Sequence, residues 1–174
     1  MNYPRRKNSL RRPGWDYRNG GCYFITFCTY KRICYFEFGV NEISQKIESI
    51  VARLPTFKGS WKLEVIEWVL MPNHIHLLLY LDSGFEHDPA PQPNNAHLSI
   101  GAITGTLKRR ISKEIKPLLP AGIEHIWQRG YYDRIVRNER EFLAIQEYIR
   151  RNPERWLEDR NNIDGVLQRM EYHR

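Results

Sequence analysis

The amino-acid sequence predicts an α+β domain with a ferredoxin-like antiparallel sheet in the split β-α-β order. Periodic patterns of apolar residues follow one another as strand, helix, strand, strand, helix, strand and helix. A length of 174 residues suits a single domain. The short turn at Met71–Asn73 joins two of these strands and makes them antiparallel neighbours. We therefore expect helices on one face of the sheet and an added C-terminal helix.

The first half of the chain contains the patterns of three strands and one helix. Residues 22–30 are dense in aromatic and β-branched side chains, which favours a strand. Residues 41–54 repeat apolar side chains at helical spacing, with Asn41 as the N-cap and a proline directly after the helix. Residues 61–70 and 74–81 are the next two predicted strands. We expect one face of the strand at 61–70 to carry Leu63, Val65, Glu67 and Val69.

The second half begins with a predicted mobile, Pro-rich loop at residues 82–97, which contains no Lys or Arg. Residues 99–119 have an apolar stripe at helical spacing and a basic opposite face. Residues 126–136 are aromatic and extended in character, which predicts a fourth strand. Residues 138–151 predict a last helix, which ends before a proline.

Charge divides the chain into three regions. Residues 1–20 form a basic N-terminal arm, residues 21–153 the folded domain and residues 154–174 a charged tail. The whole chain has 27 Lys and Arg against 20 Asp and Glu, a formal net charge of +7 and a pI of about 9.4. A basic balance of this size indicates a polyanionic partner, although many soluble proteins share it.

Membrane and secretory classes are not expected. The longest apolar run, Leu77–Leu81, is far shorter than the ~20 residues of a membrane span. The basic N-terminus is not followed by the apolar segment of a secretory signal. The odd set of Cys22, Cys28 and Cys34 fits neither a zinc pattern nor an even disulfide framework. We therefore expect a cytoplasmic protein with reduced cysteines.

Two histidines at the start of the predicted strand 74–81 are candidate metal ligands. Side chains at positions i and i+2 of a strand share a face about 6.6–6.8 Å apart, so His74 and His76 can bind one ion together. Ile75 between them points into the core. A surface or core pair of histidines has the same spacing, so the pattern alone leaves those alternatives open.

Tyr148 and Asn152 form a second candidate pair, because residues four apart on a helix share a face. A phenol hydroxyl and an amide oxygen can then approach the same point. Pro153 follows directly, which places Asn152 at the helix end. An ordinary core tyrosine followed by a C-terminal cap has the same spacing.

Three basic groups are candidates for contact with nucleic-acid phosphates: the N-terminal arm, the polar face of helix 99–119 and the end of helix 138–151. Runs of charge on helices are also common on simple solvated faces. Aromatic residues interleave with basic ones near residues 127–132, which suits single-stranded nucleic acid as well as an ordinary core. The candidates are Arg5, Arg6, Arg11, Arg12, Lys108, Arg109, Arg110, Lys113, Arg150 and Arg151.

Three segments resemble the single-tyrosine HUH transposases. Residues 68–79 (WVLMPNHIHLLL) resemble the His-hydrophobic-His motif of that family. Residues 126–137 (IWQRGYYDRIVR) resemble the segment before its last helix. Residues 147–153 (EYIRRNP) resemble the tyrosine helix of the REP-associated tyrosine transposase branch. The resemblance extends from about residue 15 to residue 162, with the three motifs in the order of the family.

The resemblance implies a transposase that cleaves and rejoins single-stranded DNA, with a hairpin in the DNA. Tyr148 would be the nucleophile, leaving a covalent 5′-phosphotyrosine and a free 3′-hydroxyl. A divalent metal, Mg²⁺ or Mn²⁺, would lie on His74 and His76 with Asn152 as third ligand. Independently of the resemblance, Glu67 on the neighbouring predicted strand is a candidate acceptor for the proton of a ligand imidazole. Relatives work as homodimers or, in the REP-associated branch, as monomers, so the resemblance leaves a homodimer open.

Residues 21–153 would then be the catalytic domain of such an enzyme. Tyr131 and Tyr132 are rival nucleophiles, although they lie on a predicted strand instead of the last helix. Alternative functions are an inactive hairpin-binding module, a metal phosphodiesterase that activates water and an RNA-binding domain. A covalent protein–DNA adduct that is lost in Tyr148→Phe would distinguish the transposase from these three.

Overall fold

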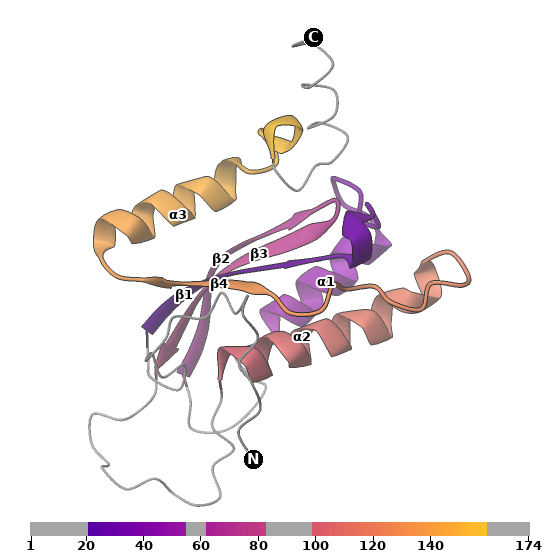
Figure 1. Ribbon diagram of the computed structural model, residues 1–174, viewed down its shortest axis with the longest axis horizontal. Helices are drawn as coiled ribbons and strands as arrows, with labels where there is room; N and C mark the ends of the chain where they lie inside the picture. Colours follow the sequence, from indigo (N-terminus) through magenta and orange to yellow (C-terminus); the bar gives the residue numbers. More distant parts are fainter. Residues whose placement is uncertain (1–20, 55–61, 83–98, 160–174) are drawn as a thin grey trace, which may run out of the picture.

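The structure is a computed structural model that describes residues 21–54, 62–82 and 99–159 (Figure 1). The predicted basic arm, nearly all of the predicted Pro-rich loop and the tail beyond residue 159 lie outside the described residues. Within the described ranges, no helix combines the length and hydropathy that crossing a membrane requires.

A four-stranded antiparallel sheet forms the centre of the fold, in the order β2-β3-β1-β4. β3 pairs with β2 on one side and β1 on the other, and β4 pairs with the free side of β1. This is the split β-α-β order, so the predicted ferredoxin-like α+β fold is confirmed. The strands are β1 (Gly21–Cys28), β2 (Lys62–Met71), β3 (His74–Asp82) and β4 (Tyr132–Val136).

The prediction that alternate residues from Leu63 to Val69 share one face of β2 is wrong beyond Val65. The pairing of β2 with β3 shifts register between Val65 and Glu67, which makes Ile66 an extra residue in a β-bulge. Leu63 and Val65 pack with the larger hydrophobic core, whereas Val69 packs with the cluster on the other face of the sheet. Strict alternation assigns all of these residues to one face, but one inserted residue moves every later side chain to the opposite face.

Helices α1 (Glu42–Ala52) and α2 (Ile100–Ile115) form one layer on the sheet (Figure 1). Asn41 caps α1 as predicted, because its side chain accepts the Ser44 N–H at 2.9 Å. The Ser44 hydroxyl accepts the Asn41 N–H in return, also at 2.9 Å, which completes a capping box. Ser99 caps α2 through its side chain. Local capping chemistry therefore fixes where both helices begin.

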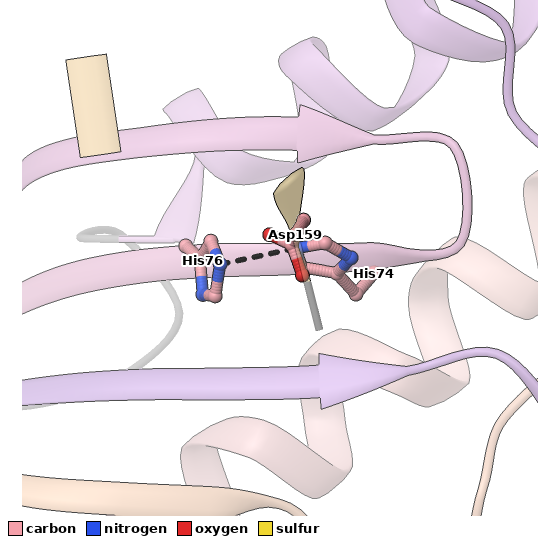
Figure 2. Close-up of side chains that lie close together, drawn as sticks. All are labelled: His74, His76 and Asp159. Carbon is pink, nitrogen blue, oxygen red and sulfur yellow. Dashed lines mark hydrogen bonds and ion pairs between the residues drawn. The ribbon is translucent and has the colours of Figure 1, made fainter. Parts of the chain in front are cut away.

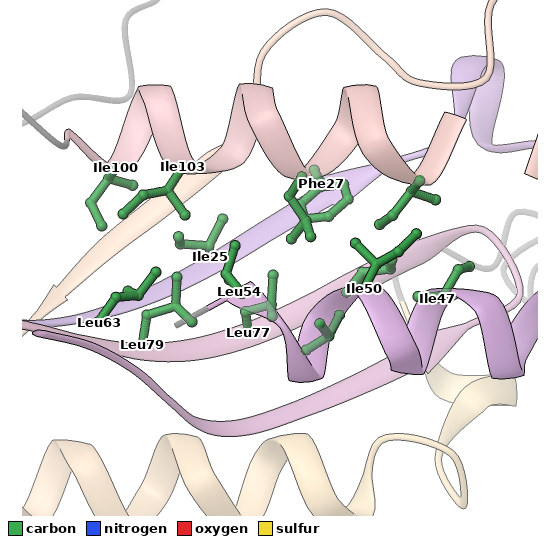
Figure 3. Packing of buried hydrophobic residues seen from close by; sticks show 14 of the residues in the cluster. Ile25, Phe27, Ile47, Ile50, Leu54, Leu63, Leu77, Leu79, Ile100 and Ile103 are labelled. Atoms are coloured by element: carbon green, nitrogen blue, oxygen red, sulfur yellow. The ribbon is translucent and has the colours of Figure 1, made fainter. Parts of the chain in front are cut away.

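The larger hydrophobic core lies between this helical layer and the sheet (Figure 3). The strands contribute alternate side chains, and the helices contribute their apolar stripes. Burial of each large aliphatic side chain stabilises the fold by about 1.5–3 kcal/mol. Buried members of this core include Ile25, Phe27, Ile47, Leu77, Leu79 and Ile100.

Helix α3 (Glu139–Arg151) lies on the opposite face of the sheet (Figure 1). Its Ile145 and Ile149 pack with Phe24 of β1 and Leu78 of β3 in a smaller cluster. A turn and the short 3-10 helix η4 (Trp156–Glu158) follow α3. The added C-terminal helix is thus present, and the side chains of the sheet that face it are available to form a site.

β4 is shorter than the strand predicted at residues 126–136. Residues 126–131 are bends and irregular backbone, and Trp127 among them makes an isolated bridge to Thr29. The Trp127 indole donates to the backbone carbonyl of Lys108 at 3.1 Å, so α2 holds this segment. Gly130 has a φ of 84°, a left-handed conformation that interrupts an extended strand.

Candidate active site

The predicted histidine pair lies at the start of β3 (Figure 2). It faces α3, whose Tyr148 contacts His76. His74 and His76 are 0% and 1% exposed, and their Nε2 atoms are 3.0 Å apart. Ile75 points to the other face and is buried in the larger core. Strand alternation thus brings two ring nitrogens to one buried point.

The other ring nitrogen of each histidine has a hydrogen-bond partner. Asn73 Oδ1 lies 2.8 Å from His74 Nδ1. The Asn73 amide nitrogen donates to the Arg32 carbonyl at 3.0 Å, which orients the amide oxygen toward the ring. Thr26 lies directly opposite His76 in the β1–β3 register, with its Oγ1 at 2.7 Å from His76 Nδ1. The amide oxygen of Asn73 is an acceptor, which keeps a proton on His74 Nδ1 and the lone pair on Nε2. The Thr26 hydroxyl can accept a proton from His76 Nδ1 in the same way, and it can also donate.

The hypothesis that Glu67 accepts an imidazole proton is wrong. Its carboxylate accepts a hydrogen bond from Arg150 Nε at 2.7 Å. The residues that orient the imidazoles are Asn73 and Thr26. The sequence pattern predicts Asn73 only as part of a turn, although it is adjacent to His74. Thr26 is recognisable as a site residue only once the register between β1 and β3 is known.

Tyr148 reaches the histidines from the facing helix. Its hydroxyl oxygen lies 3.3 Å from His76 Nε2. Its ring packs edge-on against Phe24, with centroids 6.0 Å apart, and 42% of the residue stays exposed. Of the rival tyrosines, Tyr132 lines the same pocket and Tyr131 packs against the larger core on the other face. Tyr148 is therefore both close to the histidines and accessible.

Asn152 lies at the C-terminal end of α3, as the following Pro153 predicts. It is 3% exposed and lines the same pocket as His76 and Tyr148. Its Oδ1 is buried and has no hydrogen-bond partner among the described residues. A buried carbonyl oxygen usually has a hydrogen-bond partner, so this oxygen is available to a ligand in the pocket.

Asp159 is a site residue that the sequence did not predict. The turn after α3 and η4 bring it back to β3, where its Oδ2 lies 3.8 Å from His74 Nε2 (Figure 2). One donor atom from each of His74, His76 and Asp159 lies within 4.8 Å of the other two. Asp159 falls in the predicted charged tail, where no periodicity relates it to Tyr148. Only the path of the turn places it in the site.

This donor set fits a divalent metal ion. Two imidazole Nε2 atoms and a carboxylate oxygen converge, and the buried amide of Asn152 lines the same pocket. Carboxylate and amide oxygens suit Mg²⁺ and Mn²⁺, and imidazole nitrogens are ordinary ligands of transition metals. The site is therefore compatible with the divalent metal that the family resemblance implies.

A pocket of about 670 Å³ opens beside the Tyr148 hydroxyl. Arg134, Arg151 and Arg155 are among its lining residues. Arg134 bonds to the Glu141 carboxylate through Nε at 2.6 Å, and Arg155 bonds to Glu158 at 2.9 Å. The pocket thus offers guanidinium groups that nearby carboxylates hold in place.

The basic face of α2 lies on the other side of the sheet from this pocket. Lys108 does not point into solvent: its Nζ donates to two backbone carbonyls, those of Gln128 and Gly130. Burial lowers the pKa of Lys108 to about 8. The structure therefore does not bring this cluster to Tyr148. Its other members, Arg109, Arg110 and Lys113, are exposed, and Arg5, Arg6, Arg11 and Arg12 lie outside the described residues.

Two relatives are similar to this chain over most of its length. An uncharacterized protein of Haemophilus influenzae is 28% identical over 174 residues, which cover 91% of this chain and 94% of the relative. A protein of the same organism, named as a REP-associated tyrosine transposase, is 24% identical over 143 residues. That match covers 79% of this chain and 73% of the relative.

A solved structure of a REP-associated tyrosine transposase bound to a REP hairpin shares the fold, with a TM-score of 0.54 and 17% identity. The match covers 89% of this chain and 74% of that one. The family model of IS200-like transposases matches residues 21–152, from β1 through Asn152. The sheet, the histidine pair and α3 all lie within that range. The chain therefore belongs to the IS200-like transposase family and is a DNA-processing transposase.

Proposed function

We propose that this transposase cleaves and rejoins single-stranded DNA through a covalent link between Tyr148 and a 5′-phosphate. The observation that carries the proposal is the 3.3 Å distance between the Tyr148 hydroxyl and His76 Nε2. The two residues come from α3 and β3, and the packing of Ile145 and Ile149 against the sheet holds these elements together. An accessible phenol beside a histidine pair suits a tyrosine nucleophile.

In the cleavage step, the Tyr148 oxygen attacks a backbone phosphorus. A bond between phosphorus and the tyrosine oxygen forms, and the bond between phosphorus and the 3′-oxygen breaks. The phenol loses one proton and the leaving oxygen gains one, so the step balances. The product is still a phosphodiester, and attack by a 3′-hydroxyl therefore rejoins the strand without ATP.

His74, His76 and Asn152 would hold the divalent ion, Mg²⁺ or Mn²⁺. When bound, such an ion polarises the scissile phosphate and neutralises the charge that develops on its oxygens. Asn73 and Thr26 hold the two rings so that the Nε2 lone pairs face one point. Asn152 Oδ1 offers an oxygen without a hydrogen-bond partner among the described residues.

The DNA partner that we propose is a single strand with a hairpin. Support comes from the solved neighbour of the same fold, which is bound to a REP hairpin. Arg134, Arg151 and Arg155 line the pocket beside Tyr148, where they can contact phosphates near the cut. If about six phosphates are engaged, the logarithm of affinity should fall with that of salt at a slope of roughly −4. A homodimer stays a prediction.

The proposal is tested by trapping the covalent adduct. The full chain is mixed with Mg²⁺ or Mn²⁺ and labelled single-stranded hairpins from the DNA that flanks its gene. A denaturing gel should show a shifted band for the wild type and none for Tyr148→Phe or His74→Ala. Tyr80→Phe is the matched control, because Tyr80 is 43% exposed and lies on the same face of β3 as His76. This control should keep the band.

Three results would contradict the proposal. Cleaved DNA without an adduct would indicate a phosphodiesterase that activates water. Hairpin binding without cleavage would indicate an inactive binding module. An adduct that is lost in Tyr132→Phe but kept in Tyr148→Phe would assign the nucleophile to the other tyrosine in the pocket.

A further inference from the structure

We propose that Asp159 is the anionic ligand of the divalent ion, and that the turn leading to it forms one wall of the metal centre. This inference rests on the proposed function and deepens it. The family match ends at residue 152, so Asp159 lies beyond the matched segment. The metal centre of this chain would then have two neutral imidazoles, one neutral amide and one carboxylate.

The distances support a common ion. Metal–ligand bonds of about 2.1 Å place neighbouring octahedral ligands ~3.0 Å apart and opposite ones ~4.2 Å apart. The Nε2 atoms of His74 and His76 are 3.0 Å apart, which suits neighbouring positions. Asp159 Oδ2 is 3.8 Å from His74 Nε2, between the two values, and the three donors lie within 4.8 Å of one another. Small side-chain movements are enough to place all three on one ion.

Burial and charge support the same assignment. The Asp159 side chain is 4% exposed, and a carboxylate at that depth requires compensation by charge or by hydrogen bonds. Without Asp159, the proposed ligands His74, His76 and Asn152 carry no negative charge. A hard divalent cation such as Mg²⁺ or Mn²⁺ is bound most strongly by anionic oxygen. The ion and the carboxylate would therefore each compensate the burial of the other.

The turn that carries Asp159 is anchored to the site. The Trp156 ring lies over His74, with centroids 6.0 Å apart and an interplanar angle of 33°. Phe38 contacts the Trp156 ring edge-on at 6.1 Å. The Asp159 N–H donates to the Trp156 carbonyl at 3.1 Å. The packing of Trp156 on His74 therefore holds the turn, and with it the Asp159 carboxylate, beside the histidine pair.

The test is the affinity of the full chain for Mn²⁺ in the absence of DNA, measured from the electron paramagnetic resonance signal of the free ion. Asp159→Asn keeps the shape of the side chain and removes its charge. We expect its Kd to rise at least about tenfold, or ~1.4 kcal/mol. Glu154→Gln is the matched control, because it removes one charge from an exposed residue of the same turn. Screening should keep its Kd within about twofold of the wild type.

His74→Ala distinguishes this inference from the proposed function. Loss of Mn²⁺ binding in His74→Ala with an unchanged Kd in Asp159→Asn would overturn only the role of Asp159. Unchanged binding in both variants would overturn the metal site itself. An equal rise in Kd for Asp159→Asn and Glu154→Gln would indicate a general charge effect and would also overturn the assignment.

Asp159→Cys gives a second measurement that does not depend on a loss of binding. A thiolate at this position should favour Cd²⁺ over Mn²⁺, because thiolates are soft ligands. We expect an ultraviolet thiolate-to-cadmium absorption band above the background of the wild type, which has three cysteines. No band above that background would overturn the assignment.

Discussion

Replacement of Thr26 by valine tests whether the neighbouring strand orients the histidine pair. Thr26 is 5% exposed, and its Oγ1 lies 2.7 Å from His76 Nδ1. Valine keeps the branched shape of threonine and lacks the hydroxyl, so the variant removes this partner from a buried ring nitrogen without opening a cavity. The ring can then rotate, and its proton can move to Nε2.

Two magnitudes follow from this geometry. The loss of a hydrogen bond to a buried group costs about 1–3 kcal/mol of unfolding free energy. A domain of this size loses ~2–4 °C per kcal/mol, so Tm should fall by about 2–12 °C. The loss of a residue that orients a metal-binding imidazole lowers metal affinity about 10–100-fold.

Thermal unfolding and Mn²⁺ titration measure the two effects. Thr104→Val is the matched control, since Thr104 is also buried but donates to the Ile100 carbonyl at 2.8 Å within α2, on the other face of the sheet. It should leave the Kd for Mn²⁺ unchanged. If Thr26→Val binds Mn²⁺ as tightly as Thr104→Val, then Thr26 does not orient His76 and the reasoning is refuted.

Three further predictions concern α3 and Lys108. Ile149 is fully buried, so Ile149→Ala should lower the free energy of unfolding, measured by urea titration, by about 2–5 kcal/mol. An unchanged free energy would mean that the packing of α3 does not depend on this side chain. A mixture of Tyr148→Phe and His74→Ala chains should give no covalent adduct, because Tyr148 meets the histidine pair of its own chain. A restored band would indicate exchange of α3 between two copies. Burial lowers the pKa of Lys108 from 10.5 to about 8. Between pH values of about 8 and 10.5 the unfolded chain therefore binds more protons than the folded chain, and stability rises with pH. Urea unfolding across that range should show the rise for the wild type relative to Lys108→Met, and parallel curves would contradict it.

Local patterns predict the elements of this fold well, because most of them depend on neighbouring residues. Asn41 caps α1 as its side chain requires, and strand alternation brings His74 and His76 to one face. The bulge at Ile66 is different, since it depends on how β2 pairs with β3 and not on the composition of β2. Simple alternation of side chains along β2 therefore does not predict the orientation of Glu67.

The residues around the histidines were harder to predict than the histidines themselves. Thr26 is a site residue only through the β1–β3 register, and Asp159 only through the turn after α3. Lys108 belongs to a run of basic residues that suggests a solvated face, but the segment before β4 folds over its amine. In each case the deciding contact joins residues far apart in the sequence, about which periodicity carries no information.

The sheet separates two layers that are held with unequal strength. α1 and α2 share the larger core, whereas α3 is attached through the small cluster of Phe24, Leu78, Ile145 and Ile149. Partial opening of α3 should therefore require less free energy than global unfolding, and its amide hydrogens should exchange with solvent before those of α2. The proposed nucleophile is thus carried by the layer that opens most readily. Such an opening would expose the buried His74 and His76 to solvent while the rest of the domain stays folded.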